Sequence, residues 1–373
     1  MKRFLAIALL LCVCLSTLSG CKKNKYQPVE STAEESRVIL SLTVGENNYD
    51  VRYELYRAFF LTYKSEIDGG DNSVWSSENK NEYINRINEK IVTEAAKIFA
   101  VFELCERLDI DLYTEEIEKE IRDMIIVSVD GGSWGDKTVL GFDGDYEKYL
   151  ASLKEIYHNY QTSVLLMRYS IGKQLIDDHY IGSALADDGS GRITDGAIKY
   201  TADTIRNYYN SDESSQILTT FVADGVSYTP RELAEEIRLD VIEAAKKGTN
   251  AVRVTMIDRG SPTAVAELES GILVGLNSLS RDYSEIAEVA DGLSVGEVGR
   301  VVKTVSSEDG QRYYIIYKME KSDTFFEQNY SAIVQVYLYD TIGTSLSLVA
   351  DLLQNGVTYT ENYNSIIHSE VRM

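Results

Sequence analysis

The residues best able to carry out chemistry are few in this chain and stand far apart. Of the three histidines, His158 and His179 fall on one long predicted helix, too far apart to share a metal ion, and His368 lies near the C-terminus. The sequence holds no Cys/His metal spacing, Ser/His/Asp set, phosphate-binding glycine loop or dinucleotide fingerprint. None of its acidic glycine loops combines a glycine at position six with a glutamate at position twelve, as a calcium loop does. The sequence therefore predicts neither a metal centre nor a cofactor.

The four cysteines give no disulfide framework. Cys12 and Cys14 lie in an N-terminal segment that we expect to be removed, and Cys21 has a separate predicted role. Cys105 is left alone on a predicted helix, surrounded by apolar residues. A lone thiol in that setting is more often a small core residue than a reactive nucleophile, and we expect the former.

The first twenty residues have the pattern of a bacterial targeting segment. Lys2 and Arg3 precede an apolar run, Phe4 to Leu15, that is much shorter than the ~20 residues needed to span a bilayer as a helix. The sequence Leu-Ser-Gly-Cys at 18–21 resembles the lipobox of bacterial lipoproteins, which implies diacylglycerol on Cys21 and cleavage just before it. That resemblance implies a protein lipid-anchored to the outer face of the cytoplasmic membrane, or to the periplasmic side of an envelope membrane. A secretory signal cleaved elsewhere and a short membrane anchor are the alternatives.

The composition is strongly acidic. The chain has 37 Lys and Arg against 59 Asp and Glu, a formal net charge of −22. Such a protein repels nucleic acids, which excludes functions in binding DNA or RNA. Its 26 tyrosines outnumber its 9 phenylalanines, and tyrosine combines a large apolar ring with a polar tip, as suits a groove for varied peptide segments. A general preference of the lineage for tyrosine explains the ratio equally well.

The N-terminal part of the chain is predicted to be mainly helical. Residues 21–36 are polar and unpatterned, which is typical of a flexible tether, and a strand is predicted at 38–44. Apolar residues recur every three or four positions from 82 to 108 and predict one long helix. Thr114 is placed to cap a second helix, and a third is predicted from Asp145 to Ile181.

In the centre of the chain, strands alternate with short helices. A strand is predicted at 216–223, followed by a helix that Thr229 caps and that has Pro230 at its first position. A short helix at 283–292 then precedes two alternating strands within 298–318, which are separated by a polar break. These segments predict a small antiparallel sheet with helices beside it.

This central stretch resembles a parvulin-type peptidyl-prolyl isomerase module. Leu293, Gly296 and Glu297 match the family's "L-x-x-G-E" turn, and Tyr-Tyr-Ile-Ile-Tyr at 313–317 matches the strand "G-Y-H-I-I-K". The middle of the module matches only loosely. Parvulins hold a proline ring in an apolar cup, beside a polar cluster with two histidines that surrounds the twisting amide, whose rotation barrier is ~18–20 kcal/mol.

The two family histidines fall on Thr220 and Tyr314, so the resemblance supplies no catalytic residue. Leu279 and Tyr283 fall on the cup positions, which implies a peptide-binding site made of Leu279, Tyr283 and Tyr314. A cup without its polar cluster binds a peptide but isomerises it slowly or not at all. The resemblance therefore predicts a catalytically impaired isomerase module.

The flanking regions resemble the secreted foldases of the SurA and PrsA type. A long helix followed by D-L-Y-T-E-E-I-E-K-E-I and further helix is similar to their N-terminal chaperone domain, onto which a C-terminal helix packs. Here a seam of apolar residues at 334–353 predicts that helix. The resemblance implies an α+β fold, with a helical chaperone domain completed by the C-terminal helix and an inserted parvulin-like domain. The expected parts are a signal peptide at 1–20, a tether at 21–36, the chaperone domain at 37–199, the parvulin-like domain at 200–325 and the C-terminal helix at 326–373.

Three functions are consistent with the sequence. The first is a membrane-anchored extracytoplasmic chaperone that binds unfolded or newly secreted polypeptides. The second is an active peptidyl-prolyl cis-trans isomerase with altered site residues. The third is a solute-binding lipoprotein, which predicts a strand–helix alternation that the first half of the chain lacks.

Overall fold

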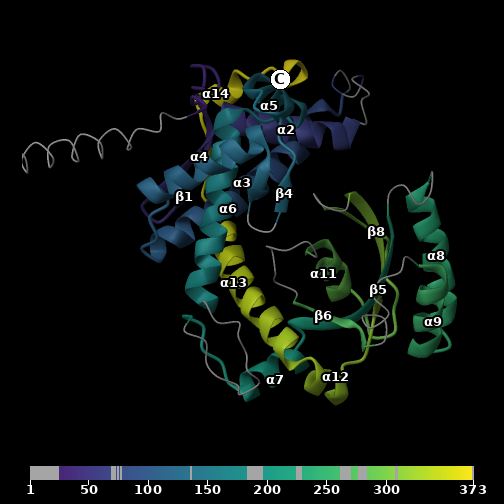
Figure 1. The fold of residues 1–373 in the computed structure, drawn as a ribbon. Helices are drawn as coiled ribbons and strands as arrows, with labels where there is room; N and C mark the ends of the chain where they lie inside the picture. Colours follow the sequence, from purple (N-terminus) through teal and green to yellow (C-terminus); the bar gives the residue numbers. More distant parts are fainter. Residues whose placement is uncertain are drawn as a thin grey trace, which may run out of the picture. The chain divides into compact units, whose positions relative to one another are not determined.

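Both ends of the chain belong to the same structural unit. In the computed structural model, unit 1 consists of Met1–Gly172 and Leu352–Met373, and unit 2 consists of Lys173–Asp351. The fold is mixed α+β, mostly helical with small antiparallel sheets, which confirms the predicted class at that level (Figure 1). The structure describes residues 25–68, 73, 75, 78–134, 137–182, 196–223, 229–260, 270–275, 284–306 and 310–371.

A three-stranded antiparallel sheet joins the two ends of the chain in unit 1. β1 (Val38–Val44) and β2 (Asn47–Arg52) form a hairpin, and β9 (Val357–Tyr359) pairs with the other edge of β1. A Cβ atom on Gly356 would lie 2.0 Å from the carbonyl oxygen of Thr43, so only glycine permits this approach of the backbones. The strand predicted at 38–44 is confirmed, whereas the sequence did not predict β2 or β9.

Helices make up most of unit 1. The long helix predicted at 82–108 is confirmed as α3 (Lys80–Arg107), whose apolar face is fully buried at Ile87 and Ile91. Thr114 caps the next helix as predicted, because its side chain accepts the N–H of Ile117 at 3.3 Å. The other elements of this part of the chain are α2 (Tyr53–Asp68), α4 (Glu115–Asp130), β3 (Gly132–Trp134), β4 (Lys137–Val139), α5 (Tyr146–Glu155), α6 (Tyr160–Ile181), α14 (Glu361–Asn364) and the 3-10 helix η2 (His368–Glu370).

The single helix predicted from Asp145 to Ile181 is wrong, because the chain turns between α5 and α6. Tyr157 adopts a left-handed backbone conformation with φ +63°, and the N–H of His158 closes the turn on the carbonyl of Leu153 at 2.8 Å. Asn159 then accepts the N–H of Thr162 at 2.8 Å and so starts α6. Helical periodicity continues across such a break, which is why the pattern did not show it.

A flexible tether is expected at 21–36, and the described part of that segment, from Lys25 onward, contacts other residues of unit 1. The ring of Tyr26 stacks on Tyr146 with centroids 4.9 Å apart, and its hydroxyl donates to Asp130 at 2.5 Å. Further along, the side-chain amide of Gln161 donates to the carbonyl of Val29 at 2.9 Å. Large rings and long-range hydrogen bonds therefore hold a segment whose composition alone is typical of a linker.

Unit 2 is built around a four-stranded antiparallel sheet of order β6-β5-β8-β7. Thr201 forms a capping box at the start of α7 (Ala202–Asn210). The elements of this part of the chain are α7 (Ala202–Asn210), β5 (Ser214–Ala223), α8 (Pro230–Ala245), α9 (Thr249–Arg259), β6 (Ile272–Gly275), α11 (Ser284–Asp291), β7 (Val302–Ser306), β8 (Gly310–Lys318), α12 (Asp323–Gln328) and α13 (Tyr330–Asn355).

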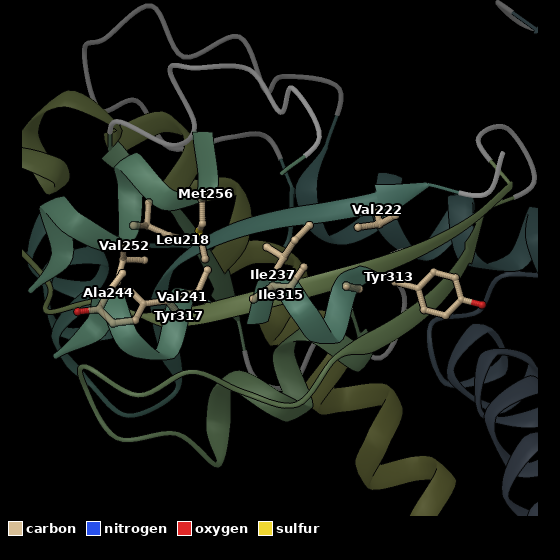
Figure 2. Packing of buried hydrophobic residues seen from close by; sticks show 11 residues of the cluster. Leu218, Val222, Ile237, Val241, Ala244, Val252, Met256, Tyr313, Ile315 and Tyr317 are labelled. Atoms are coloured by element: carbon tan, nitrogen blue, oxygen red, sulfur yellow. The ribbon is translucent and has the colours of Figure 1, made fainter. Parts of the chain in front are cut away.

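Each face of the sheet in unit 2 is covered by helices and carries its own core. Figure 1 shows α8 and α9 on one side of the strands and α11 on the other. Figure 2 shows the first core, in which Leu218 and Ile315 from the strands meet Ile237 from α8. The second core contains Ile217 and Ile316 packed beside α11. Side chains therefore alternate between two separate environments along each strand.

The apolar helix predicted near the C-terminus is α13, which ends at Asn355, just before Gly356. Within the described residues it is the one helix long and apolar enough to span a membrane by length and composition. Core helices pass the same test, and its residues Ile333, Leu338 and Ile342 are almost completely buried in the protein.

Candidate functional site

Thr220 and Tyr314, the two positions assigned to family histidines, do not lie in one site. β5 and β8 are adjacent, and their register pairs Thr220 with Ile315 and Phe221 with Tyr314. Because neighbouring residues of a strand point to opposite faces, Thr220 faces α9 and Tyr314 faces α11. A Cβ atom on Gly260, just after α9, would lie 1.9 Å from the Thr220 hydroxyl oxygen. The two positions to which the resemblance assigns family histidines therefore lie on opposite faces of the sheet.

Thr220 is a core residue. Its side chain is 0% exposed, and its hydroxyl has no hydrogen-bond partner among the described residues. Thr219, one position earlier, pairs with Ile316 and so faces the α11 side with Tyr314. An error of one residue in assigning a strand position is sufficient to exchange the two faces.

The α11 side of the sheet carries aromatic rings and a guanidinium group at these positions. The rings of Phe221 and Tyr314 lie 5.2 Å apart, and the guanidinium carbon of Arg312 lies 4.4 Å from the Phe221 ring centroid. Arg312 also donates to the Tyr314 hydroxyl at 3.4 Å. Such a group offers ring faces and positive charge, but it contains no histidine or carboxylate.

Sequence reasoning did not identify Phe221 and Arg312, although the strand register would have identified both. Tyr314 is only 6% exposed, so most of its ring is part of the core beside α11. Leu279 and Tyr283, the other predicted peptide-binding residues, lie outside the described residues, as does the predicted lipidation site Cys21. The peptide-binding role of these side chains stays a prediction.

Unit 1 contains a cleft of about 840 Å³ that the sequence did not predict. It lies between the start of α2 with the preceding strand, the end of α3 with the following loop, and the first two turns of α6. Its apolar and aromatic walls are formed by Tyr49, Leu55, Phe99, Phe102, Ile110, Leu112, Tyr113, Val164 and Leu165. Charged side chains at the same cleft are Asp50, Arg52, Glu54, Glu106, Asp109, Asp111 and Arg168.

Glu103 is a buried residue that positions Tyr49, which lines one wall of this cleft. The carboxylate is 4% exposed and accepts hydrogen bonds from Asn47 at 2.8 Å, Tyr49 at 2.9 Å and Arg107 at 2.7 Å. Burial alone raises the pKa of Glu103, but the bonds from Asn47, Arg107 and Tyr49 outweigh it, and the pKa lies below its ordinary value. The Tyr49 ring is thereby fixed against Phe99, with centroids 5.3 Å apart.

Arg168 fixes the opposite rim. This guanidinium is 7% exposed; it donates to the carbonyl of Leu112 and to Glu118 at 2.7 Å. Its carbon lies 4.5 Å from the ring centroid of Tyr113, which is 66% exposed. A buried cation and its acceptors therefore support an aromatic ring that stands in solvent at the edge of the cleft.

The remaining reactive side chains are structural in character. Burial raises the pKa of Cys105 to about 12, so the thiol stays protonated at neutral pH, and its interpretation as a core residue is confirmed. Burial also lowers the pKa of His368 to about 4, with a further contribution from Lys80, and its ring nitrogen lies 3.1 Å from the Tyr56 hydroxyl. Among the described residues no three His, Cys, Asp or Glu side chains are grouped so as to hold a metal ion.

Comparison with known proteins gives structural likenesses only. No protein-family model matches the chain, and no curated protein matches it. Among solved structures, the chain is similar to the foldase protein PrsA from Lactococcus lactis, with 15% identity, a TM-score of 0.23, and 91% of this chain and 100% of that chain covered. It is also similar to PrsA from Streptococcus pneumoniae (13% identity, TM-score 0.22, 88% and 99% covered) and from Bacillus subtilis (14%, 0.22, 86% and 93%). These likenesses extend over most of the chain, at identities and TM-scores too low to transfer an activity.

Proposed function

We propose that this chain is an extracytoplasmic chaperone that binds unfolded or newly secreted polypeptides. The cleft of unit 1 is the observation that carries the proposal. A cleft of about 840 Å³ has the size of an ordinary ligand site and accommodates several side chains of an extended peptide. The rings of Tyr49, Phe99 and Tyr113 offer apolar faces that accept many different side chains, as binding of unrelated clients requires.

The sheet of unit 2 is proposed to be an isomerase module that has lost its catalytic cluster. Its α11 side carries Phe221, Arg312 and Tyr314, and the resemblance assigns a family histidine to the position of Tyr314. Rings and a guanidinium group bind a peptide, but they do not relay a proton near the twisting amide. Leu279 and Tyr283 are kept in this proposal as the cup for a proline ring.

The proposed layout follows the foldase resemblance. Residues 37–199 form the chaperone domain, 200–325 the parvulin-like domain, and 326–373 the helix that returns to the chaperone domain. The pairing of β9 with β1 supports the last point. All strand pairs among the described residues are antiparallel, which does not favour a solute-binding lipoprotein.

Anchoring is proposed to depend on the lipid at Cys21. Replacing Cys21 by serine is expected to release the protein from the membrane fraction, because a single residue carries the acyl chains. Fractionation of cells that express either form, with mass spectrometry of the N-terminal peptide, measures this. Wild-type protein found in the soluble fraction without an acyl group on Cys21 would exclude the proposed location.

The chaperone function is tested by aggregation of an unfolded client in the presence of the purified mature chain. Val164→Ser with Leu165→Ser places two hydroxyls in the cleft and is expected to weaken suppression of aggregation several-fold, since apolar burial of about 0.8 kcal/mol per methylene is lost. The matched control is Leu140→Ser with Ile156→Ser; these residues are 90% and 57% exposed, lie in the same unit and do not line the cleft. Circular dichroism and thermal unfolding verify that both variants are folded.

Two outcomes would contradict the proposal. The first is equal loss of protection in the cleft and control variants, and the second is absence of protection by the wild-type chain. A proline-peptide assay on the same preparations separates the isomerase alternative, because uncatalysed isomerisation takes about tens to hundreds of seconds. We expect no acceleration, whereas an acceleration that Tyr314→Phe abolishes would assign catalysis to this module.

A further inference from the structure

The charges around the cleft of unit 1 are unbalanced. Its lining includes five carboxylates, Asp50, Glu54, Glu106, Asp109 and Asp111, and two arginines, Arg52 and Arg168. Arg168 is already paired with Glu118, which does not line the cleft. A concave surface lined mainly by one sign of charge concentrates its field in the cleft and attracts ligands of the opposite sign.

The carboxylates of Glu106, Asp109 and Asp111 are the part of this charge that is available to a ligand. They follow one another at the end of α3 and in the loop after it, and all are exposed. None of them forms an ion pair within the described part of the chain; Asp111 accepts the N–H of Tyr113 at 2.8 Å, and Glu106 is 3.4 Å from the Tyr49 hydroxyl. By contrast, Glu54 accepts hydrogen bonds from Ser31 and Asn159 and belongs to the wall.

The backbone fixes the positions of these carboxylates. The N–H of Leu108 bonds to the carbonyl of Leu104 at 3.1 Å, and that of Ile110 bonds to the carbonyl of Cys105 at 2.9 Å, which closes the end of α3. Asp109 takes the left-handed conformation at this turn, with φ +56°. The C-terminal end of a 28-residue helix also carries partial negative charge, which adds to that of the side chains.

The arrangement does not suit a single metal ion. No three carboxylate, histidine or cysteine side chains in the described ranges converge on one point, and that includes the three carboxylates at this rim. Separated negative charges beside apolar walls instead match separated positive charges on an apolar chain. The rings of Tyr49 and Tyr113 reinforce the match, because aromatic faces attract ammonium and guanidinium groups.

We propose that the cleft selects cationic apolar client segments, in which lysine or arginine alternates with leucine or phenylalanine. This inference rests on the proposed chaperone function and adds the substrate class. The apolar side chains bind between Phe99 and Leu165, while the cations lie along Glu106, Asp109 and Asp111. Clients of the same hydrophobicity with acidic residues are repelled by both the rim and the net charge of the chain.

Three fluorescein-labelled peptides test the inference on the purified mature chain. They share their leucine and phenylalanine positions, and the positions between are all lysine, all glutamine or all glutamate. Fluorescence anisotropy at low and high salt is expected to give affinities in the order lysine, glutamine, glutamate. The advantage of lysine over glutamine should be about tenfold at low salt and shrink at high salt, because exposed charge pairs contribute little individually and are screened.

The decisive variant neutralises the three exposed carboxylates at the end of α3 and in the loop after it, which are called the acidic rim here. Glu106→Gln with Asp109→Asn and Asp111→Asn should remove most of the tenfold preference for the lysine peptide over the glutamine peptide. The control is Glu82→Gln with Glu89→Gln and Glu155→Gln, which removes the same charge from exposed sites of unit 1 outside the cleft. A preference that survives the rim variant, or falls equally in the control, would show that net charge and not the cleft selects the ligand.

The outcomes separate this inference from the function on which it rests. Equal affinities for the three peptides, with aggregation still suppressed, overturn the cationic preference and leave the chaperone function intact. Absence of binding to every peptide, together with no suppression of aggregation, removes both.

Discussion

Replacing Gly356 by alanine is expected to lower the free energy of unfolding by about 1–3 kcal/mol, because the new methyl group has no space. Its Cβ would lie 2.0 Å from the oxygen and 2.9 Å from the carbon of the Thr43 carbonyl. Both atoms belong to the backbone of β1, which accommodates the methyl group only by moving away. The hydrogen bond from the Thr43 N–H to the Gly356 carbonyl, 3.2 Å long, and the pairing of β9 with β1 are then lost.

Urea unfolding of the purified chain measures this change, and limited proteolysis locates it. We expect the segment after residue 355 to become accessible to protease before the rest of unit 1. Gly292→Ala is the matched control, since its Cβ meets only the carbonyl oxygen of Val289 at 3.8 Å, an ordinary contact. If Gly356→Ala lowers the free energy of unfolding no more than Gly292→Ala does, β9 does not stabilise unit 1.

Replacing Glu103 by alanine is expected to lower the free energy of unfolding by about 2–3 kcal/mol, because it removes the buried acceptor of three hydrogen bonds. Asn47 and Tyr49 then lose the group that holds the β1–β2 hairpin onto α3, and Arg107 loses its ion pair. Since Tyr49 lines the cleft, the same variant should also bind clients more weakly. The control is Glu106→Gln, because Glu106 directly precedes Arg107 in the sequence but is exposed. This variant should change the free energy of unfolding by less than about 0.5 kcal/mol.

The contribution of the Glu103 carboxylate to the free energy of unfolding should fall as the pH is lowered. Its pKa in the folded protein lies below the ordinary value of 4.5, so the carboxylate stabilises the fold fully above that value. The stabilisation is lost as the pH falls through the folded pKa. The difference in unfolding free energy between wild type and Glu103→Gln should therefore be constant at neutral pH and shrink below pH about 4.5. A difference that grows on acidification would contradict the assigned hydrogen bonds.

The sequence predicted those structural features that depend only on residues close together in the chain. α3 was predictable because a long helix with one buried face must repeat apolar residues every three or four positions, and Thr114 was predictable because a cap requires only a hydroxyl at one position. The turn at Tyr157 was not predictable, because tyrosine seldom takes a positive φ and the helical spacing continues on both sides. β9 was missed because its three residues are largely exposed and its partner strand is at the other end of the chain.

The sites were harder to predict than the elements, because they depend on register and on distant segments. Thr220 and Tyr314 are each on the strand where they were expected, but one residue of offset puts them on opposite faces. The cleft combines the hairpin near Tyr49, the end of α3 and the start of α6, which no pattern in the sequence connects. The sequence showed only the residue types that line the cleft, as an excess of tyrosine and of acidic residues.

The attachment of Tyr26 to Asp130 and Tyr146 begins only five residues after Cys21, the residue proposed to carry the lipid. With the lipid proposed at Cys21, only four peptide links separate the acyl chains from Lys25, and a fully extended chain of that length spans at most about 14 Å. The same attached segment continues to Val29 and Ser31, which bond to Gln161 and Glu54 at the edge of the cleft. With the proposed lipid on Cys21, this short connection would keep the cleft close to the lipid headgroups, where an exported polypeptide emerges.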